Sequence, residues 1–180
     1  GLMLLAACTK QLEQVNPNAQ TSASFWQTET DALGGINAAY SSLLPDGGYM
    51  RCTPLMLDTR GDDAKSNSPW DQMFNTGKFA LQSGNIDIYG WAYETYYQGV
   101  FRSNQVLQNL PGMNIDAALK DRIIGQAYFL RGLYYYHLVN FFGRVPLVLN
   151  VPEVNTYNVP QASVEDGWNQ VIADFKEAAN

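Results

Sequence analysis

Residues 125–148 read GQAYFLRGLYYYHLVNFFGRVPLV, and this stretch decides the fold. Apolar positions in and just before it recur at helical spacing, which is typical of a helix packed along its length against another helix. Asp116 is placed as an N-cap, and Gly143 stands just past the last apolar position. The sequence therefore predicts one long helix between them, with a buried stripe formed by Leu119, Ile123, Ala127, Leu130, Tyr134, Leu138 and Phe141.

Two glycines lie inside this predicted helix. Gly125 and Gly132 each lower its propensity by about 1 kcal/mol relative to alanine. Close packing offsets that cost, so we expect another helix to approach the chain at these positions. After Gly143, Pro146 favours an extended backbone at the residue before it, which predicts a strand-like segment over residues 144–149.

Three more helices are predicted outward from this one. Thr28 and Asp31 form a capping box for a helix over residues 28–45, and Ser163 with Asp166 does the same for residues 163–180. A helix over residues 88–110 carries an aromatic stripe and ends at a Pro-Gly pair. Residues 46–85 lack periodicity and are rich in turn formers, so they are predicted to be mostly loop with short elements.

The predicted fold class is mainly α, with helix pairs of tetratricopeptide type and long irregular loops. Short turns between helices favour such pairs, although the strict repeat pattern is not met in the sequence. Residues 25–180 are assigned to this helical domain. The last predicted helix stops without a terminating Gly or Pro, so we expect these residues to be the amino-terminal part of a longer domain.

Composition limits the possible functions. Lys and Arg number 11 against 17 Asp and Glu, a net charge of −6 that speaks against a nucleic-acid partner. No apolar run reaches the roughly 20 residues of a membrane-spanning helix. The chain carries 4 Trp, 11 Tyr and 8 Phe, and so many rings must form either core or binding surface.

The first residues indicate a lipid anchor. Leu5-Ala6-Ala7-Cys8 matches the lipobox of bacterial lipoproteins, in which the Cys thiol receives a diacylglyceryl group. Residues 1–7 are then the remnant of a signal peptide, and residues 8–24 are the lipidated Cys8 and a tether. The alternative is an ordinary buried first element. Lipidation of Cys8 leaves Cys52 without a disulfide partner, so Cys52 is predicted to be a buried apolar residue.

Catalytic and metal-binding signatures are absent from the sequence. His137 is the only histidine and is predicted to be a packed residue on the long helix. The sequence from Asp58 does not match a calcium-binding loop. Arg60 stands where the loop requires a calcium ligand, and Asp63 stands where it requires a glycine. A looser calcium site using Asp58, Asp62 and Asp63 stays open beside a solvated acidic turn. No cofactor and no metal are predicted.

Residues 67–75 combine rings with amides. Aromatic faces pack against the C–H face of a pyranose while Asn, Asp and Arg bond its hydroxyls, so this mixture suits neutral sugars. The predicted ligand-binding residues are Trp70, Asn67, Asp71 and Arg60. The alternative is that Trp70 and Phe74, which stand at helical spacing, anchor a short helix into the core.

Residues 125–148 closely resemble the hallmark helix of SusD/RagB-family outer-membrane lipoproteins. Other segments agree in order, and the resemblance covers essentially the whole chain as an amino-terminal third of a family member. These segments are the lipobox, Asn16-Pro17, Phe25-Trp26, Asp31-Ala32, Asn37 to Tyr40, Trp91 to Leu107, Ser163-Val164-Glu165 and Ile172 to Phe175.

This resemblance implies a SusD-like helical fold and a function without catalysis. Such a protein is lipid-anchored at the cell surface in the outer membrane, where it forms a lid on a TonB-dependent SusC-like transporter. It captures oligosaccharides or other nutrients for import. Two alternatives stay open: a lid or assembly subunit with little glycan affinity of its own, and a glycan-processing enzyme whose carboxylates lie beyond residue 180.

Overall fold

The computed structural model describes residues 25–80, 87–153 and 158–180. Cys8, the lipobox and the predicted tether lie outside the described residues, so their assignment stays a prediction. Within the described ranges the chain is mainly helical, as predicted, and no strand forms beyond one isolated antiparallel bridge. The helices are α2 (Glu29–Ser41), α3 (Cys52–Asp58), α4 (Asp71–Gly77), α5 (Asp87–Asn109), η2 (Leu110–Gly112), α6 (Ala117–Phe142) and α7 (Val164–Ala178).

Helix α6 is the long helix that the sequence predicts. The Asp116 carboxylate accepts a hydrogen bond from the Leu119 backbone N–H at 2.8 Å, and Gly143 ends the helix with a positive φ of 69°. The predicted stripe is confirmed, because its five central members are fully buried: Ile123, Ala127, Leu130, Tyr134 and Leu138.

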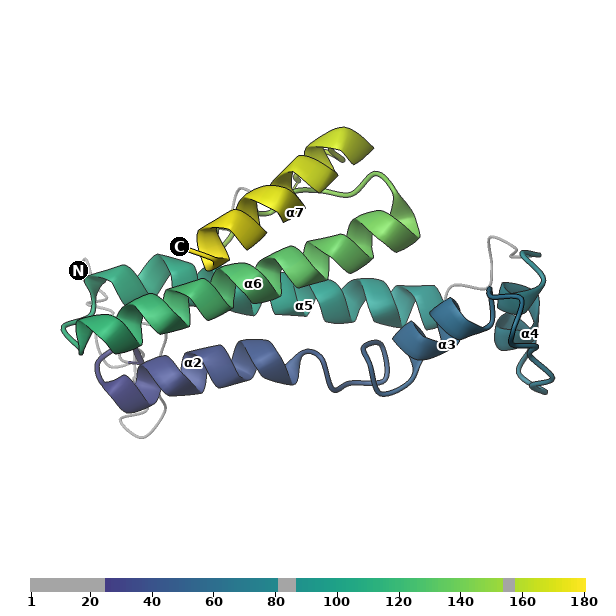
Figure 1. The fold of residues 1–180 in the computed structure, drawn as a ribbon, viewed down its shortest axis with the longest axis horizontal. Coiled ribbons are helices and arrows are strands. Elements are labelled where there is room, and N and C mark those ends of the chain that lie inside the picture. Colours follow the sequence, from purple (N-terminus) through teal and green to yellow (C-terminus); the bar gives the residue numbers. More distant parts are fainter. Residues whose placement is uncertain (1–24, 81–86, 154–157) are drawn as a thin grey trace, which may run out of the picture.

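The glycine prediction is also confirmed, and α7 is the approaching helix. A Cβ atom added to Gly132 would lie 3.0 Å from the Phe175 ring, and one added to Gly125 would lie 3.4 Å from the Ala178 carbonyl oxygen. Figure 1 shows α7 crossing over α6 on the side away from α2. The last helix, α7, begins at the predicted Ser163 cap, whose hydroxyl accepts from the Asp166 N–H at 3.0 Å.

Helix α2 begins as predicted and ends earlier than predicted. The Thr28 hydroxyl accepts from the Asp31 N–H at 3.2 Å, and the Asp31 carboxylate accepts from the Thr28 N–H at 2.8 Å. The Thr28 hydroxyl also donates to the Asp31 carboxylate at 2.8 Å, and this bond together with that from the Thr28 N–H holds the pKa of the Asp31 carboxyl below its usual value. The helix was expected to reach residue 45, but it ends at Ser41, after which the chain turns.

Side chains from the two long helices account for this early end. Arg102 of α5 donates to the Ala38 carbonyl oxygen at 3.1 Å, and Tyr134 of α6 donates to the Ala39 carbonyl oxygen at 2.6 Å. The last carbonyls of a helix lack partners within it, so these donors satisfy them. The end of α2 is therefore set by packing against α5 and α6, which local sequence does not encode.

Helices α5 and α6 lie side by side as the long axis of the molecule (Figure 1). The α5 prediction is confirmed, with η2 formed by the expected Leu-Pro-Gly ending. Residues 144–149 leave the helix as predicted but form no strand, and the strand-like character is limited to one isolated bridge between Pro146 and Gln161. The loop prediction for residues 46–85 is confirmed over residues 46–80, where only α3 and α4, of 7 residues each, interrupt the loop, and residues 81–85 lie outside the described residues.

Cys52 opens α3 and is fully buried, as predicted. It is a free thiol, and burial raises its pKa, which makes it a small apolar core residue. Figure 1 places α3 and α4 at the end of the molecule where α5 begins.

A buried ion pair joins three helices and a loop. The Arg131 guanidinium of α6 donates to the two Asp174 carboxylate oxygens of α7, at 2.9 and 2.6 Å. Its third nitrogen donates to the Asn104 side-chain oxygen of α5 at 2.9 Å and to the Leu149 carbonyl at 3.1 Å. Asn104 in turn donates to the Val148 carbonyl at 2.8 Å. The guanidinium fork is therefore bonded on every side.

We predict that Asp174→Ala lowers the free energy of unfolding by about 3–5 kcal/mol, because it leaves the Arg131 charge buried and unpaired. Chemical denaturation measures this change. Glu177→Ala, an exposed carboxylate on the same helix, is the matched control and should change stability by less than about 0.5 kcal/mol. Equal effects of the two variants would contradict the prediction.

Candidate functional site

Two tryptophans meet where α4 and α5 begin. Trp70 is the N-cap of α4 and is half-buried against the core, whereas Trp91 on α5 is 41% exposed. Their ring centroids lie 6.0 Å apart with an interplanar angle of 40°. The Trp70 backbone N–H donates to the Ser68 hydroxyl at 3.1 Å, which fixes the turn into α4. Trp91 is therefore the exposed ring of the pair, and Trp70 is the half-buried ring beside it.

Arg51 lies against both rings. Its guanidinium carbon is 5.4 Å from the Trp70 ring centroid and 5.3 Å from that of Trp91. This cation–π geometry holds the planar guanidinium against the rings, and Asp46 forms an ion pair with it. We call Trp70, Trp91 and Arg51 the tryptophan–arginine cluster. Its positive charge is balanced by Asp46.

A hollow of about 280 Å³ adjoins the cluster, and Trp91 and the Arg51 partner Asp46 both line it. Gly47 forms part of its wall, and only glycine fits there, because a Cβ atom would lie 2.1 Å from the Trp91 carbonyl oxygen. Glu94 and Gln98 of α5 line the hollow and are exposed. Carboxylate and amide groups thus stand beside an exposed ring, which is a combination that can bind hydroxyl groups.

The structure separates the four predicted ligand residues. Trp70 belongs to the cluster, Asp71 is exposed in the first turn of α4, and Asn67 is exposed in the preceding loop. Arg60 lies elsewhere, with its Nη2 donating to the Tyr89 hydroxyl at 2.8 Å. Tyr89 and Trp91 are about 200° apart around α5. The arginine beside Trp70 is therefore Arg51, while Arg60 belongs to another flank.

Sequence reasoning missed Arg51 and Trp91 as site residues. Trp91 carried a usable signal, since it falls off the buried stripe of its helix while being a large ring. Arg51 carried none, because its approach to the rings depends on the path of the chain between α2 and α3. The predicted alternative of a short helix is also present, since α4 forms with Trp70 and Phe74 half-buried.

The described residues contain no cluster of three or more His, Cys, Asp or Glu side chains that could hold a metal ion. Asp58, Asp62 and Asp63 of the looser calcium proposal are all exposed. In the same described part of the chain, no helix combines the length and apolar character needed to cross a bilayer.

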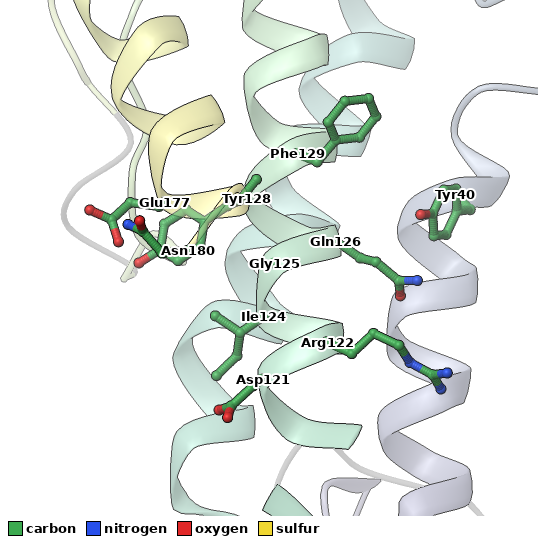
Figure 2. Close-up of a pocket in the computed structure, with 11 residues that line it drawn as sticks. Tyr40, Asp121, Arg122, Ile124, Gly125, Gln126, Tyr128, Phe129, Glu177 and Asn180 are labelled. Atoms are coloured by element: carbon green, nitrogen blue, oxygen red, sulfur yellow. The ribbon is translucent and has the colours of Figure 1, made fainter. Parts of the chain in front are cut away.

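A larger hollow, of about 670 Å³, lies where α6 meets the end of α7. Figure 2 shows its side chains on two sides of α6: Arg122 and Gln126 point from α6 toward α2, whereas Glu177 and Asn180 lie at the end of α7. A small-molecule site needs polar groups that converge on one position. This hollow lacks that convergence, and none of the predicted ligand residues lines it.

His137 is packed among rings, as predicted, and is 4% exposed. It stacks on Tyr96 with ring centroids 5.0 Å apart, and its Nε2 hydrogen-bonds the Tyr49 hydroxyl at 2.5 Å. The Nδ1 atom is buried without a described partner. Burial lowers the pKa of His137 to about 4, so the neutral imidazole is the folded form and serves packing.

The fold agrees with that of similar proteins. The chain belongs to the SusD-like family, because the family model described as starch-binding and associating with the outer membrane matches residues 10–180. The class is therefore that of SusD-like proteins, a family described by carbohydrate binding and association with the outer membrane.

Particular relatives include SusD-like protein P2 of Formosa agariphila, which is 27% identical over 98% of this chain and 35% of its own length. SusD-like protein P38 of the same organism is 24% identical over 99% of the chain. The chain thus spans about a third of the length of the curated relatives it matches.

Solved structures show the same fold. A laminarin-binding SusD-like protein matches with a TM-score of 0.71 and 29% identity, over 84% of this chain and 34% of that protein. A SusD superfamily protein of Bacteroides vulgatus matches with a TM-score of 0.73 and 24% identity, over 86% and 35% of the two chains. The predicted SusD-like helical fold is confirmed.

We predict that stability falls as pH decreases from about 6.5 to about 4, in part because of His137. Its folded pKa of about 4 lies below the unfolded value of about 6.5, so the unfolded chain binds the proton first. The contribution is up to about 3 kcal/mol and is fully present above pH 6.5. Denaturant titrations at several pH values measure it.

His137→Phe keeps a ring in the stack and removes this titration, so its stability should depend less steeply on pH over that window. Carboxylates contribute to acid lability equally in both proteins, and the difference between the two profiles isolates His137. Identical profiles would show that the imidazole titrates normally in the folded state.

Proposed function

We propose that this protein is a cell-surface lipoprotein that binds oligosaccharides and delivers them to a TonB-dependent SusC-like transporter without chemically altering them. Membership of the SusD-like family supports the ligand class and the association with the outer membrane. The laminarin-binding protein with the same fold supports a glycan ligand.

The observation that carries this proposal is the tryptophan–arginine cluster with its adjoining hollow. Trp91 offers an exposed face for the apolar side of a sugar ring, and Trp70 with Arg51 holds that ring in place. Rigid rings lose little conformational entropy on binding. Asp46 and Glu94 stand beside Trp91 as hydroxyl acceptors. Because Asp46 balances Arg51, this surface suits a neutral pyranose.

Asn67 and Asp71 extend the proposed site along α4. Both are exposed and flank Trp70 in the sequence, with Asp71 in the first turn of the helix. An amide and a carboxylate beside a ring can bond the hydroxyls of a second sugar residue. Under this proposal the site binds at least two consecutive sugar residues of an oligosaccharide.

The anchor is proposed from the sequence alone. Lipidation of Cys8 would add two or three acyl chains, enough for stable attachment, since a single chain gives only reversible binding. The 16 residues that follow, 9–24, are mostly polar and could span at most roughly 50 Å when extended. The helical domain would then stand outside the outer membrane within reach of a transporter.

A second candidate function is that of a helical lid or assembly subunit with little glycan affinity. The apolar surface at α2, α6 and α7 favours it. Phe129 is 47% exposed and packs against Phe175, with ring centroids 5.6 Å apart. Phe129 and Tyr40 of α2 both line the hollow of about 670 Å³ where α6 meets the end of α7. An exposed apolar surface of this kind suits a protein contact. Co-purification with a β-barrel partner, together with no glycan binding, would establish it.

We predict that Trp91→Ala weakens binding of a neutral glucan such as laminarin by about 5- to 100-fold, in keeping with the loss of one stacked ring. Trp70→Ala should weaken it as well, by removing the support of Trp91. Isothermal titration calorimetry measures both. Phe101→Ala is the matched control, because Phe101 lies on the same helix and is also 41% exposed. If all three variants bind as the native protein does, the site assignment is wrong.

We predict that Cys8→Ser moves the protein from the membrane fraction to the soluble fraction of a cell that processes lipoproteins. The reason is that a hydroxyl at this position cannot form the thioether that carries the diacylglyceryl group. Fractionation and mass spectrometry of the amino-terminal peptide measure the change. Cys52→Ser, at the buried thiol, is the control and should leave membrane association intact.

A further inference from the structure

Arg60 has a setting unlike that of Arg51 and Arg131, which also lie beside rings but each form an ion pair. Its guanidinium carbon lies 5.6 Å from the Tyr89 ring centroid and 5.8 Å from that of Phe79. Its Nη2 donates to the Tyr89 hydroxyl at 2.8 Å, and that hydroxyl donates to Thr76 at 3.4 Å. Neutral groups alone therefore hold this half-buried cation in position.

No carboxylate balances the charge of Arg60 in the described part of the chain. The two ion pairs found there join Arg51 to Asp46 and Arg131 to Asp174. Acidic residues outnumber basic ones by 17 to 11 in the sequence, and Asp58 and Asp62 are sequence neighbours of Arg60. The Arg60 Nε atom is buried without a described hydrogen-bond partner. Arg60 therefore lacks a carboxylate partner among the described residues although Asp and Glu outnumber Lys and Arg in the chain.

Phe79 completes this setting. It is 70% exposed and has a φ of 54°, a left-handed conformation that is uncommon for a bulky residue. Such strain persists only where surrounding structure enforces it, and it concentrates at ligand sites. The residue before it adds a second cation, since the Lys78 ammonium lies 3.8 Å from the Phe74 ring centroid. An exposed ring and the Arg60 guanidinium thus meet just after α4, and Lys78, which lies over Phe74, precedes Phe79 in the sequence.

We propose that Arg60, Phe79 and Tyr89 form a second binding site, which takes the acidic group of a glycan, either a carboxylate or a sulfate. The planar guanidinium matches the oxygens of such a group in geometry and charge. Phe79 offers its face to the sugar ring that carries the acid. The site lies on the flank of α5 opposite Trp91, so it is separate from the tryptophan–arginine cluster. That its acid belongs to a glycan rests on the proposed function.

Nuclear magnetic resonance of the Arg60 Nε–H group tests the site directly. Galacturonate and galactose differ in the carboxylate at one carbon, so galacturonate should shift this resonance and galactose should not. Arg60→Lys keeps the charge but loses the planar fork, and the response of the Phe79 ring to galacturonate should weaken in this variant. If neither sugar shifts the Arg60 resonance, or if both shift it equally, the proposal is overturned.

Oligosaccharide binding tests the consequence for selectivity. The native protein should bind an oligogalacturonate about tenfold more tightly than its methyl ester, or sulfated laminarin about tenfold more tightly than laminarin, the factor expected for one charge-assisted hydrogen bond. The two pairs distinguish a carboxylate from a sulfate. Arg60→Gln should abolish the preference, whereas Lys65→Gln, at an exposed lysine outside the site, should retain it.

The two proposals fail in different ways. A protein that binds neutral and acidic oligosaccharides equally, with Arg60→Gln unchanged, overturns the acidic site and leaves the proposed function standing. A protein that binds no oligosaccharide overturns the proposed function, and the galacturonate titration of Arg60 then decides the acidic site alone.

Discussion

The rest of the structure depends on the burial of one charge, that of Arg131. A buried guanidinium is tolerated only when its donors are bonded, and here the partners come from α7, from α5 and from the loop after α6. Both oxygens of Asp174 reach it only when α7 crosses α6 at the glycines that allow close approach. The ion pair therefore fixes the register of α7 on α6, and the adjoining glycines fix how closely the two helices pack.

The hydrogen bonds of Arg131 also help to position Tyr89 and Trp91, which lie far from Arg131 along α5. Asn104 ties the C-terminal half of α5 to Arg131 and to the loop after α6, so α5 is a rigid support that carries Tyr89 and Trp91 near its other end. The loop after α2 returns to this end and packs Gly47 against the Trp91 carbonyl. Binding side chains on loops held by a rigid helix are a common arrangement in ligand sites, and here the helix is held at its C-terminal half.

The sequence predicted the helices well where local rules act. The stripe of α6, the capping residues of α2, α6 and α7, and the glycines at the α6–α7 contact all follow from spacing and side-chain chemistry. It predicted the site only in part. Trp70 is in the cluster, but Arg51 replaces Arg60 beside it, because the turn through Gly47 is set by tertiary packing. The early end of α2 at Ser41 has the same origin, since its carbonyls are satisfied by Arg102 and Tyr134.

The two ring–cation groups differ in one physical respect that matters for selectivity. Asp46 neutralises Arg51, so under the proposed function the cluster around Trp91 would gain little from a charged ligand, and stacking would supply most of its affinity. Arg60 has no such partner in the described residues, and a neutral ligand leaves its desolvated donors unsatisfied, which carries a penalty. Under the two proposals, affinity and discrimination would therefore reside in different side chains on opposite flanks of α5. Because a single sugar residue contacts only one flank, evolution could change the charge preference at Arg60 without altering the rings that bind the polymer.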